Sequence, residues 1–309
     1  MARPAKSGPG QRAALRHDAD ALGHALPALL IEARRVAQSV MHGVHGRRQP
    51  GPGEEFWQYR AYAQGDSAAE IDWRKSARAE RVLVRENEWM AANTLWLWVQ
   101  TDEGMSYHSH LAPVSKAHRA ALIALALATL ATRAGERICA IGAPHRPDHT
   151  ARAVENLAAW IDPQDPARRD NLPPAAQLPR FSTCVLIGDL FAPPQALEGR
   201  IRQLAARGAR GHLLQVVDPA EETFPFTGRT IFEDFASSDS LTLGKAEELR
   251  AAYQERLTAH RDHLKTLARR LNWTFQVHRT DSPPQAALLA LHARIGGQAR
   301  ASVAMGGTS

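Results

Sequence analysis

The sequence predicts an α/β protein whose mostly parallel β-sheet is covered by helices on both faces. Two observations lead to this prediction. From residue 93 onward, short continuous apolar runs alternate with longer segments of helical spacing, and the runs show no apolar–polar alternation. Strands buried on both faces have this composition, and strand–helix alternation is typical of parallel sheets. The 309 residues leave room for one large domain or two modest ones.

The elements of this domain follow from the position of each run. We expect strands at residues 94–101, 137–143, 183–190, 211–217 and 273–278. We expect helices at residues 115–134, 151–161, 194–207, 245–272 and 285–295, where apolar residues recur at three- and four-residue spacing. Residues 218–244 break the rhythm with a Thr227–Gly228 turn between apolar residues, which favours a β-hairpin insertion.

The chain before residue 93 has a different organisation. Residues 1–18 are rich in Pro, Gly, Ser, Ala and Arg and are interpreted as a disordered tail. Residues 19–92 are expected to hold a helix over 19–41 and a small segment with short strands, in which aromatic and charged residues interleave. The α/β domain is then expected over residues 93–295, and residues 296–309 are interpreted as a second disordered tail.

Composition and charge exclude several classes of protein. With 44% hydrophobic and 23% charged residues the chain has ordinary globular composition. The net charge is +6, but eight Lys and Arg against three acids put +5 of it in residues 1–50, so the rest of the chain is almost neutral. The basic pI therefore describes an N-terminal segment, and no nucleic-acid partner is expected.

The cysteines and the apolar runs predict the cellular location of the protein. Cys139 and Cys184 lie inside apolar runs and are interpreted as buried thiols in a reducing compartment. The longest apolar run, Ala120–Ala131, is too short for a membrane span, which needs about 20 residues. We see no signal peptide, and we expect a cytoplasmic location without a membrane span.

Three acids follow predicted strands and are candidates for a metal site. Asp102, Asp189 and Asp218 come at the carboxyl ends of strands, where parallel sheets bind their ligands. Carboxylate and hydroxyl oxygens are ligands for Mg²⁺, so Asp102 with Ser106 in the same loop and Asp189 on a neighbouring strand could supply them. The alternative is that these acids only cap the helices that follow.

The segment before residue 93 offers a second candidate site. Its charged and aromatic residues either form a buried structural network, since buried charges must be paired, or a docking surface for a partner. The residues are Arg60, Asp66, Asp72, Trp73, Arg78, Arg85 and Glu86. Other classes of site lack their motifs: no phosphate-binding glycine loop, no nucleophile elbow and no Cys-containing zinc pattern is present.

The order of motifs in this segment resembles a known family. The motifs are Gly53–Phe56, Arg60–Tyr62, Gly65–Asp66, Ile71–Trp73, Ser76–Arg78 and Val84–Glu86, followed later by Val217–Pro219, Glu221 and Phe224–Pro225. Together they resemble the signature of domain-of-unknown-function family 58, with the match running from about residue 19 to residue 295. The resemblance implies a von Willebrand factor A-like domain preceded by a family-specific segment. It also implies a partner, a MoxR-type AAA+ ATPase.

The resemblance further implies a metal-ion-dependent adhesion site. On its Asp-x-Ser-x-Ser pattern, Asp102 takes the first position and Ser106 the last, Asp189 is the later acid, and Thr150 is the candidate for the Thr. The chain departs from the pattern at Gly104, where the missing hydroxyl removes a ligand. Mg²⁺ is the cofactor that this degenerate site would hold.

These observations predict a non-enzymatic interaction module that docks a partner through the carboxyl-end loops of the sheet. Two alternatives come from other classes. A metal-dependent hydrolase could use Asp102 and Asp189 with a bound water, although no general base is evident near the Asp102 loop in sequence. Nucleic-acid binding could use the basic residues 1–50.

Overall fold

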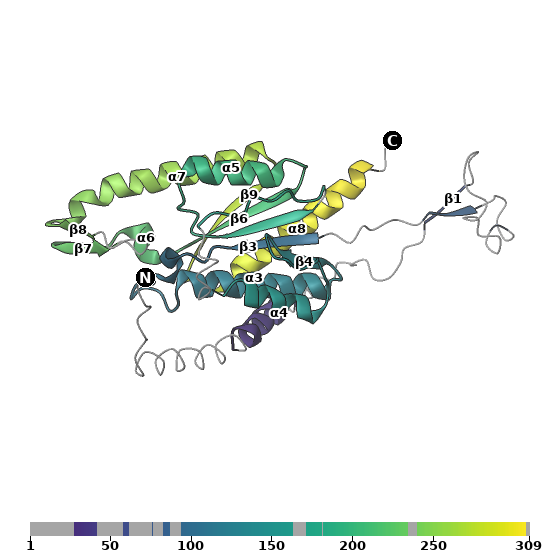
Figure 1. The fold of residues 1–309 in the computed structure, drawn as a ribbon, viewed down its shortest axis with the longest axis horizontal. Coiled ribbons are helices and arrows are strands. Elements are labelled where there is room, and N and C mark those ends of the chain that lie inside the picture. Colours follow the sequence, from purple (N-terminus) through teal and green to yellow (C-terminus); the bar gives the residue numbers. More distant parts are fainter. Residues whose placement is uncertain are drawn as a thin grey trace, which may run out of the picture. The chain divides into compact units, whose positions relative to one another are not determined.

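The computed structural model describes residues 28–41, 58–61, 76, 83–86, 94–162, 171–180, 182–233 and 240–306. The chain divides into two compact units (Figure 1). The larger unit consists of Met1–Met41 and Asn93–Ser309, and the smaller one of His42–Ala92. The two units are therefore described separately.

A five-stranded parallel sheet is the centre of the larger unit. Its strands are β3 (Thr94–Val99), β4 (Arg137–Ala140), β5 (Thr183–Gly188), β6 (Arg210–Val217) and β9 (Thr274–Arg279). They lie in the order β4-β3-β5-β6-β9, and every neighbouring pair is parallel. The predicted α/β fold with a mostly parallel sheet is confirmed.

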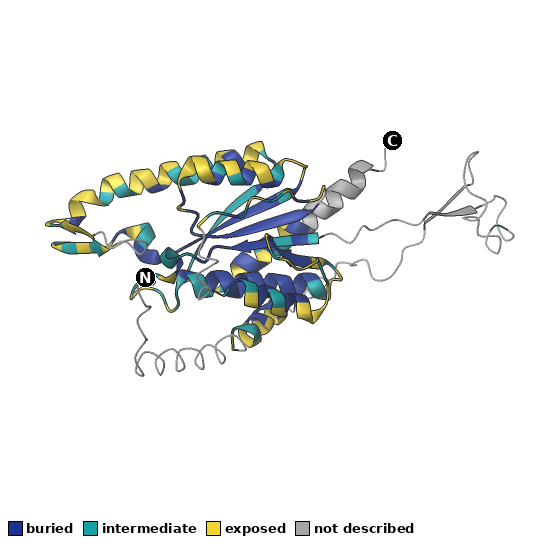
Figure 2. Ribbon diagram, viewed as in Figure 1, coloured by how far each residue is buried: buried dark blue, intermediate teal, exposed yellow. Residues whose placement is uncertain are grey.

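Helices cover both faces of this sheet (Figure 1). The helices are α3 (Lys116–Arg133), α4 (Ala151–Trp160), α5 (Pro194–Ala205), α7 (Arg250–Arg270) and α8 (Pro284–Gly306). One apolar cluster joins α3, α4 and α8 to one face of the sheet, and a second joins α5 and α7 to the other. The inner strands β5 and β6 and the helix α3 are accordingly among the most buried elements (Figure 2). Both predicted thiols, Cys139 and Cys184, are buried and free.

The sequence of α3 explains why it lies so deep. From Ala120 to Ala131 every residue except Thr129 is Ala, Leu or Ile, so this part of the helix presents apolar surface all round, which is typical of a helix buried on most sides. Ser115 caps its start by accepting a hydrogen bond from the His118 amide. Its burial fixes the position of Lys116, the first residue of the helix, beside the end of the sheet.

The predicted insertion after β6 is a short helix followed by a hairpin. The helix α6 (Pro219–Thr223) comes first, and β7 (Thr230–Glu233) then pairs with β8 (Ser240–Leu243) in antiparallel register. Phe224 stacks on Phe232 of the hairpin, and the ring of Phe226 contacts both of them edge to face. The 3-10 helix η4 (Ala246–Leu249) leads from the hairpin into α7.

Two boundaries differ from the prediction. Residues 19–92 were grouped together, but the helix over residues 28–41 contributes Ala33, Val36, Ala37 and Val40 to the core of the larger unit. Residues 296–309 were predicted to be a disordered tail, whereas α8 continues to Gly306. Good helix formers such as Ala, Gln and Arg follow Gly296–Gly297, and each glycine costs only about 1 kcal/mol in a helix.

The smaller unit contains one described ladder. Strand β1 (Gln58–Ala61) pairs with β2 (Leu83–Glu86) in antiparallel register, with Arg60 opposite Val84, Arg85 opposite Tyr59 and Glu86 opposite Gln58. These short strands agree with the β-containing segment expected there. The other predicted network residues, Asp66, Asp72, Trp73 and Arg78, lie outside the described residues.

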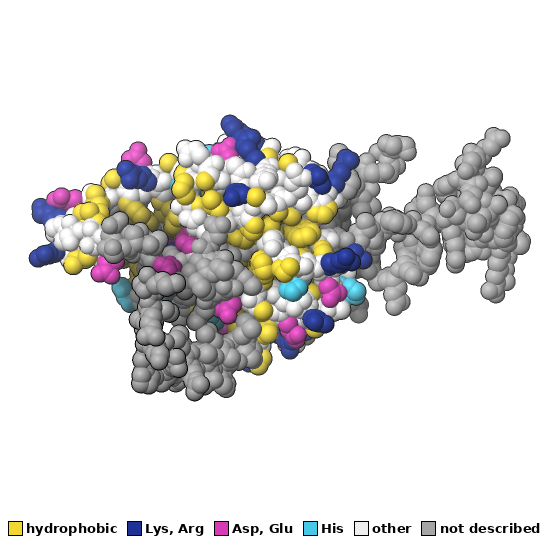
Figure 3. All heavy atoms as spheres, viewed as in Figure 1, with side chains coloured by type: hydrophobic (Ala, Val, Ile, Leu, Met, Phe, Trp, Pro, Cys, Tyr) yellow, Lys and Arg dark blue, Asp and Glu magenta, His cyan; other side chains and the backbone are white. Residues whose placement is uncertain are grey.

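Two surface properties bear on the possible partners. In the described part of the chain, no helix is both long and apolar enough to cross a lipid bilayer. On the face drawn in Figure 3, the Lys and Arg side chains of the described residues lie in separate small groups with acidic side chains between them. This distribution differs from the single basic stripe that binds phosphate backbones.

Candidate functional site

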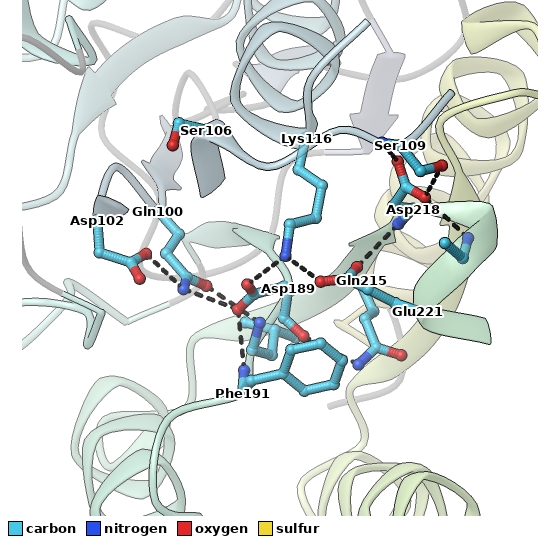
Figure 4. Close-up of polar contacts among 12 residues, drawn as sticks. Gln100, Asp102, Ser106, Ser109, Lys116, Asp189, Phe191, Gln215, Asp218 and Glu221 are labelled. Atoms are coloured by element: carbon cyan, nitrogen blue, oxygen red, sulfur yellow. Dashed lines mark hydrogen bonds and ion pairs between the residues drawn. The ribbon is translucent and has the colours of Figure 1, made fainter. Parts of the chain in front are cut away.

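The candidate site lies where the direction of strand succession reverses. The first strand of the sheet, β3, is followed in sequence by β4 on one side and by β5 on the other, so the loops after β3 and β5 diverge. Such a switch point, at the carboxyl ends of the strands, is the usual ligand-binding place of open parallel sheets. Asp102 follows β3 and Asp189 follows β5, and the structure brings these two predicted residues together (Figure 4).

Gln100 joins the two carboxylates. Its Nε2 donates to Asp102 Oδ1 at 2.7 Å and to Asp189 Oδ1 at 2.8 Å, while its Oε1 accepts from the Leu190 amide at 3.0 Å. The Leu190 bond sets which end of the amide faces the acids. The absence of a side chain at Gly188 makes this arrangement possible, since a Cβ there would lie 2.3 Å from Gln100 Oε1.

Asp189 is also bound by a buried lysine. Lys116 Nζ lies 2.9 Å from Asp189 Oδ2 and 2.5 Å from Glu221 Oε1, and its side chain is only 2% exposed. The amide of Phe191 donates to Asp189 Oδ1 at 3.0 Å. Both oxygens of Asp189 therefore accept hydrogen bonds from donors within the chain.

The surroundings of Lys116 keep it charged. Burial disfavours the ammonium, but the charges of Asp189 and Glu221 outweigh that effect and raise the pKa of Lys116. Two aromatic rings complete its shell, with Nζ 5.9 Å from the Tyr107 ring centre and 5.7 Å from that of Phe191. Both distances are within the range of a cation–π interaction.

Asp102 is the more accessible of the two carboxylates. Burial raises the pKa of Asp102, the hydrogen bond from Gln100 opposes that rise, and the nearby charge of Asp189 adds to it. The side chain does not cap the 3-10 helix η2 (Glu103–Ser106) that follows. Helix capping, the alternative explanation for the strand-end acids, therefore does not account for Asp102.

Capping does account for Asp218. Its Oδ1 accepts from the Ala220 amide at 2.8 Å, while Glu221 Oε2 accepts from the Asp218 amide at 2.9 Å, which completes a capping box at α6. Asp218 Oδ2 also accepts from the Ser109 amide at 2.8 Å and so holds the loop after β3. Because Glu221 also binds Lys116, the capping box joins the insertion to the switch point.

The remaining predicted ligands lie elsewhere or lack a ligating atom. The exposed Ser106 hydroxyl donates to the Glu103 carbonyl at 2.6 Å. The Thr150 hydroxyl donates to Asp148 at the start of α4 and not to the two carboxylates. Gly104 does face the pair, since a Cβ at that position would lie 3.2 Å from Asp102 Oδ2 and 3.9 Å from Asp189 Oδ2.

These donors do not fit a divalent cation. Mg²⁺ needs oxygen ligands in a near-octahedral arrangement, but the group between Asp102 and Asp189 is the N–H₂ end of Gln100. The other oxygen of Asp189 binds an ammonium. In the part of the chain that the structure describes, no three His, Cys, Asp or Glu side chains gather in a way that could hold a metal ion.

The turn after β5 presents an aromatic side chain at the surface. Leu190 has a φ of 58°, in the left-handed region that costs a non-glycine residue about 1–2 kcal/mol, and its side chain is fully buried. Its amide binds Gln100 and its carbonyl oxygen lies 2.9 Å from His260 Nε2, so the turn is fixed on both sides. Phe191, the next residue, is 41% exposed.

Sequence reasoning missed Gln100, Lys116, Glu221 and Phe191. Two of them left a signal in the sequence. Gln100 is a polar residue at the end of an otherwise apolar strand, and Lys116 begins a helix that is apolar on nearly every side. A polar or charged side chain within such an apolar segment is seldom buried unless a hydrogen-bond or ionic partner accompanies it. No local pattern connects Glu221 or Phe191 with them.

Comparison with known proteins identifies relatives that match most of the chain. A family described as "Protein of unknown function DUF58" matches residues 58–263. The protein called Uncharacterized protein Rv1480, of Mycobacterium tuberculosis, is 28% identical to this chain over 267 residues, which cover 80% of this chain and 82% of that protein. Uncharacterized protein Mb1516, of Mycobacterium bovis, matches to the same extent.

Two solved structures are similar at a lower level. One is an aerotolerance-related membrane protein from Bacteroides fragilis, with a TM-score of 0.41, 13% identity, and coverage of 66% of this chain and 99% of that one. The other is the conserved hypothetical protein BatB from Bacteroides thetaiotaomicron, with a TM-score of 0.34, 10% identity and the same coverage. Nothing about the site of this chain follows from likenesses this distant.

Proposed function

The chain belongs to the family "Protein of unknown function DUF58", and from this premise we propose that it is a non-enzymatic protein-interaction module. It docks a partner through the loops at the carboxyl ends of β3 and β5. The observation that carries the proposal is the exposed Phe191 ring, which lies over a polar cluster whose groups bind one another.

The bonding of Asp189 and Lys116 argues against a catalytic role for these two residues. A general base needs a free lone pair, and a nucleophilic lysine needs a lowered pKa. Here Asp189 accepts three hydrogen bonds, and the pKa of Lys116 is raised. Such a cluster is suited to fixing the shape of the loops around it.

The same bonding suits recognition. Exposed aromatic residues that are held in place lose little entropy on binding and are frequent among the residues that dominate interfaces. The fixed turn at Leu190 holds Phe191, and the partly exposed Asp102 adds a charge at the same end of the sheet. Leu111, exposed in the loop after β3, adds apolar surface there.

We propose a MoxR-type AAA+ ATPase as the partner, on the family resemblance described above. The docking end is the one at which the resemblance to von Willebrand factor A-like domains puts the metal-ion-dependent adhesion site. On the face drawn in Figure 3, the scattered charges of the described residues favour a protein partner over nucleic acid. That the protein acts in the cytoplasm stays a prediction.

Titration calorimetry between the full chain and a MoxR-type ATPase encoded near it tests this proposal. We expect Phe191→Ala to weaken binding at least tenfold and Asp102→Ala to weaken it by a smaller factor. The matched control is Leu289→Ala, which shortens an exposed apolar side chain on α8. No binding by the wild type, or an equal effect of Phe191→Ala and the control, would contradict the proposal.

A further inference from the structure

We propose that the Lys116 ammonium is the resident cation of the switch point. It takes the place of the divalent ion that the sequence pattern implies, so the cluster is complete without a metal. The expected metal ligands Asp102 and Asp189 do lie together, but the groups that bind them are the Gln100 amide and the Lys116 ammonium.

The contacts of Lys116 are those of a bridging cation. Asp189 comes from the end of β5 and Glu221 from α6, so the ammonium joins two acids from separate elements. Both distances, 2.9 Å and 2.5 Å, are in or below the usual range of charge-assisted hydrogen bonds. Without the ammonium the buried Asp189 and the partly buried Glu221 would repel each other across a region of low dielectric.

The enclosure of Lys116 distinguishes it from a surface ion pair. Its side chain is 2% exposed, and the rings of Tyr107 and Phe191 lie within 6 Å of Nζ. A lysine side chain pays a large entropy cost for being fixed in one rotamer, and an exposed pair seldom repays it. Here the helix start, two acids and two rings hold the ammonium in one place.

The charge balance links Asp102 to the same cation. Asp102 and Asp189 share Gln100 Nε2 as their hydrogen-bond donor, which holds the two carboxylates close together. The single positive charge of Lys116 thus lies among three acids, Asp102, Asp189 and Glu221. If the Lys116 ammonium were removed, the remaining carboxylates and the space that the ammonium had filled would favour uptake of a cation from solution.

A metal titration of the full-length wild type is the first test. Melting temperatures are measured in chelator and in millimolar Mn²⁺, which binds oxygen ligands of the same kind as Mg²⁺. We expect no difference between the two conditions. A rise in Mn²⁺ that the Asp102→Asn variant loses would overturn the proposal, because the wild-type cluster would then hold a metal.

Removal of the ammonium is the second test. In chelator we expect Lys116→Met to melt on the order of 10 °C below the wild type, because the buried Asp189 and the partly buried Glu221 lose their counter-charge. We expect Mn²⁺ to restore part of this loss. The control is Lys265→Met, an exposed lysine on α7 that pairs only with Asp262 among the described residues.

The melting temperatures of Lys116→Met, the wild type and the Lys265→Met control together decide whether the proposal holds. The proposal is wrong if Lys116→Met has the same melting temperature as the Lys265→Met control. It is also wrong if Mn²⁺ changes the melting temperature of Lys116→Met no more than that of the wild type. If Lys116→Met does not fold, Lys116→Gln replaces it, since the amide keeps a hydrogen-bond donor without the charge. None of these measurements requires a partner, so the result is separate from that of the docking proposal.

Discussion

Two buried cations lie one turn apart on α3, and they differ in their binding partners and in the direction in which their pKa is shifted. Lys116 binds two carboxylates, and its pKa is raised. Arg119 is also buried, but among the described residues no carboxylate forms an ion pair with it. Its Nη2 donates to the Thr280 carbonyl at 2.8 Å, its Nε has no hydrogen-bond partner, and burial lowers the pKa of Arg119.

The difference shows what each cation does. When a buried charge has two counter-charges, removing one of them costs much free energy. A buried charge that binds only a carbonyl is less well compensated for the free energy lost when it leaves water. Lys116 therefore organises the switch point, and Arg119 joins α3 to the end of β9 with little gain in stability. Three predictions test this comparison.

The largest effect is expected for Asp189→Ala. The substitution leaves Lys116 buried with only Glu221 as a counter-charge, and losses of about 3–5 kcal/mol are typical when one member of a buried pair is removed. Urea denaturation measures the free energy of unfolding. Asp281→Ala, which breaks an exposed pair with Arg279, is the matched control and should cost less than about 1 kcal/mol. Equal losses would remove the distinction between the two kinds of pair.

The second effect is a loss of stability in acid near Arg119. Burial and then the Arg119 charge lower the pKa of His278 to about 4, below the ordinary value of 6.5. Between these pH values the unfolded chain binds a proton that the folded chain does not, so the free energy of unfolding falls as pH drops from about 6.5 to about 4. The loss approaches about 3 kcal/mol for this one group.

Urea denaturation across this pH range checks the prediction with the His278→Gln variant. Its curve should be flatter than that of the wild type, although some slope remains because burial also lowers the pKa of His212 to about 4. The exposed His110→Gln variant is the control and should keep the wild-type slope. If His278→Gln keeps the wild-type slope as well, His278 is not the responsible group.

The smallest effect is expected for Arg119→Met. The variant loses one hydrogen bond to a carbonyl, but it also removes a buried guanidinium with an unpaired Nε, so the net cost should be about 1 kcal/mol or less. The pH dependence should weaken too, because the Arg119 charge helps to lower the pKa of His278. A loss as large as that of Asp189→Ala would mean that both cations are equally important.

The sequence predicted the parts of the molecule that depend on local composition. The apolar runs of β3, β5 and β6 located the strands, and the parallel arrangement followed from the helices between them. Since parallel strands end at one edge, the positions of Asp102 and Asp189 could also be predicted. A hairpin was also predicted in the insertion, but its turn was wrongly placed at Thr227–Gly228, which precedes β7 and does not lie between the paired strands β7 and β8.

The chemistry between these acids could not be predicted in the same way. Gln100 follows a strand, Lys116 begins a helix and Glu221 lies in an insertion 105 residues after Lys116, and only the packing of α3 on the sheet brings them together. Their hydrogen bonds decide whether the acids face a cation from solution or one from the chain. A ligand pattern such as Asp-x-Gly-x-Ser contains no information on that point.

The interruption of the larger unit by residues His42–Ala92 has a consequence for folding kinetics. The helix over residues 28–41 is synthesised before the other described helices, but the core into which Val36 and Val40 pack includes residues as late as Ile295. Closing a loop that long costs entropy before any contact repays it, and non-local contacts slow folding. We therefore expect the first-made helix to be among the last elements to dock.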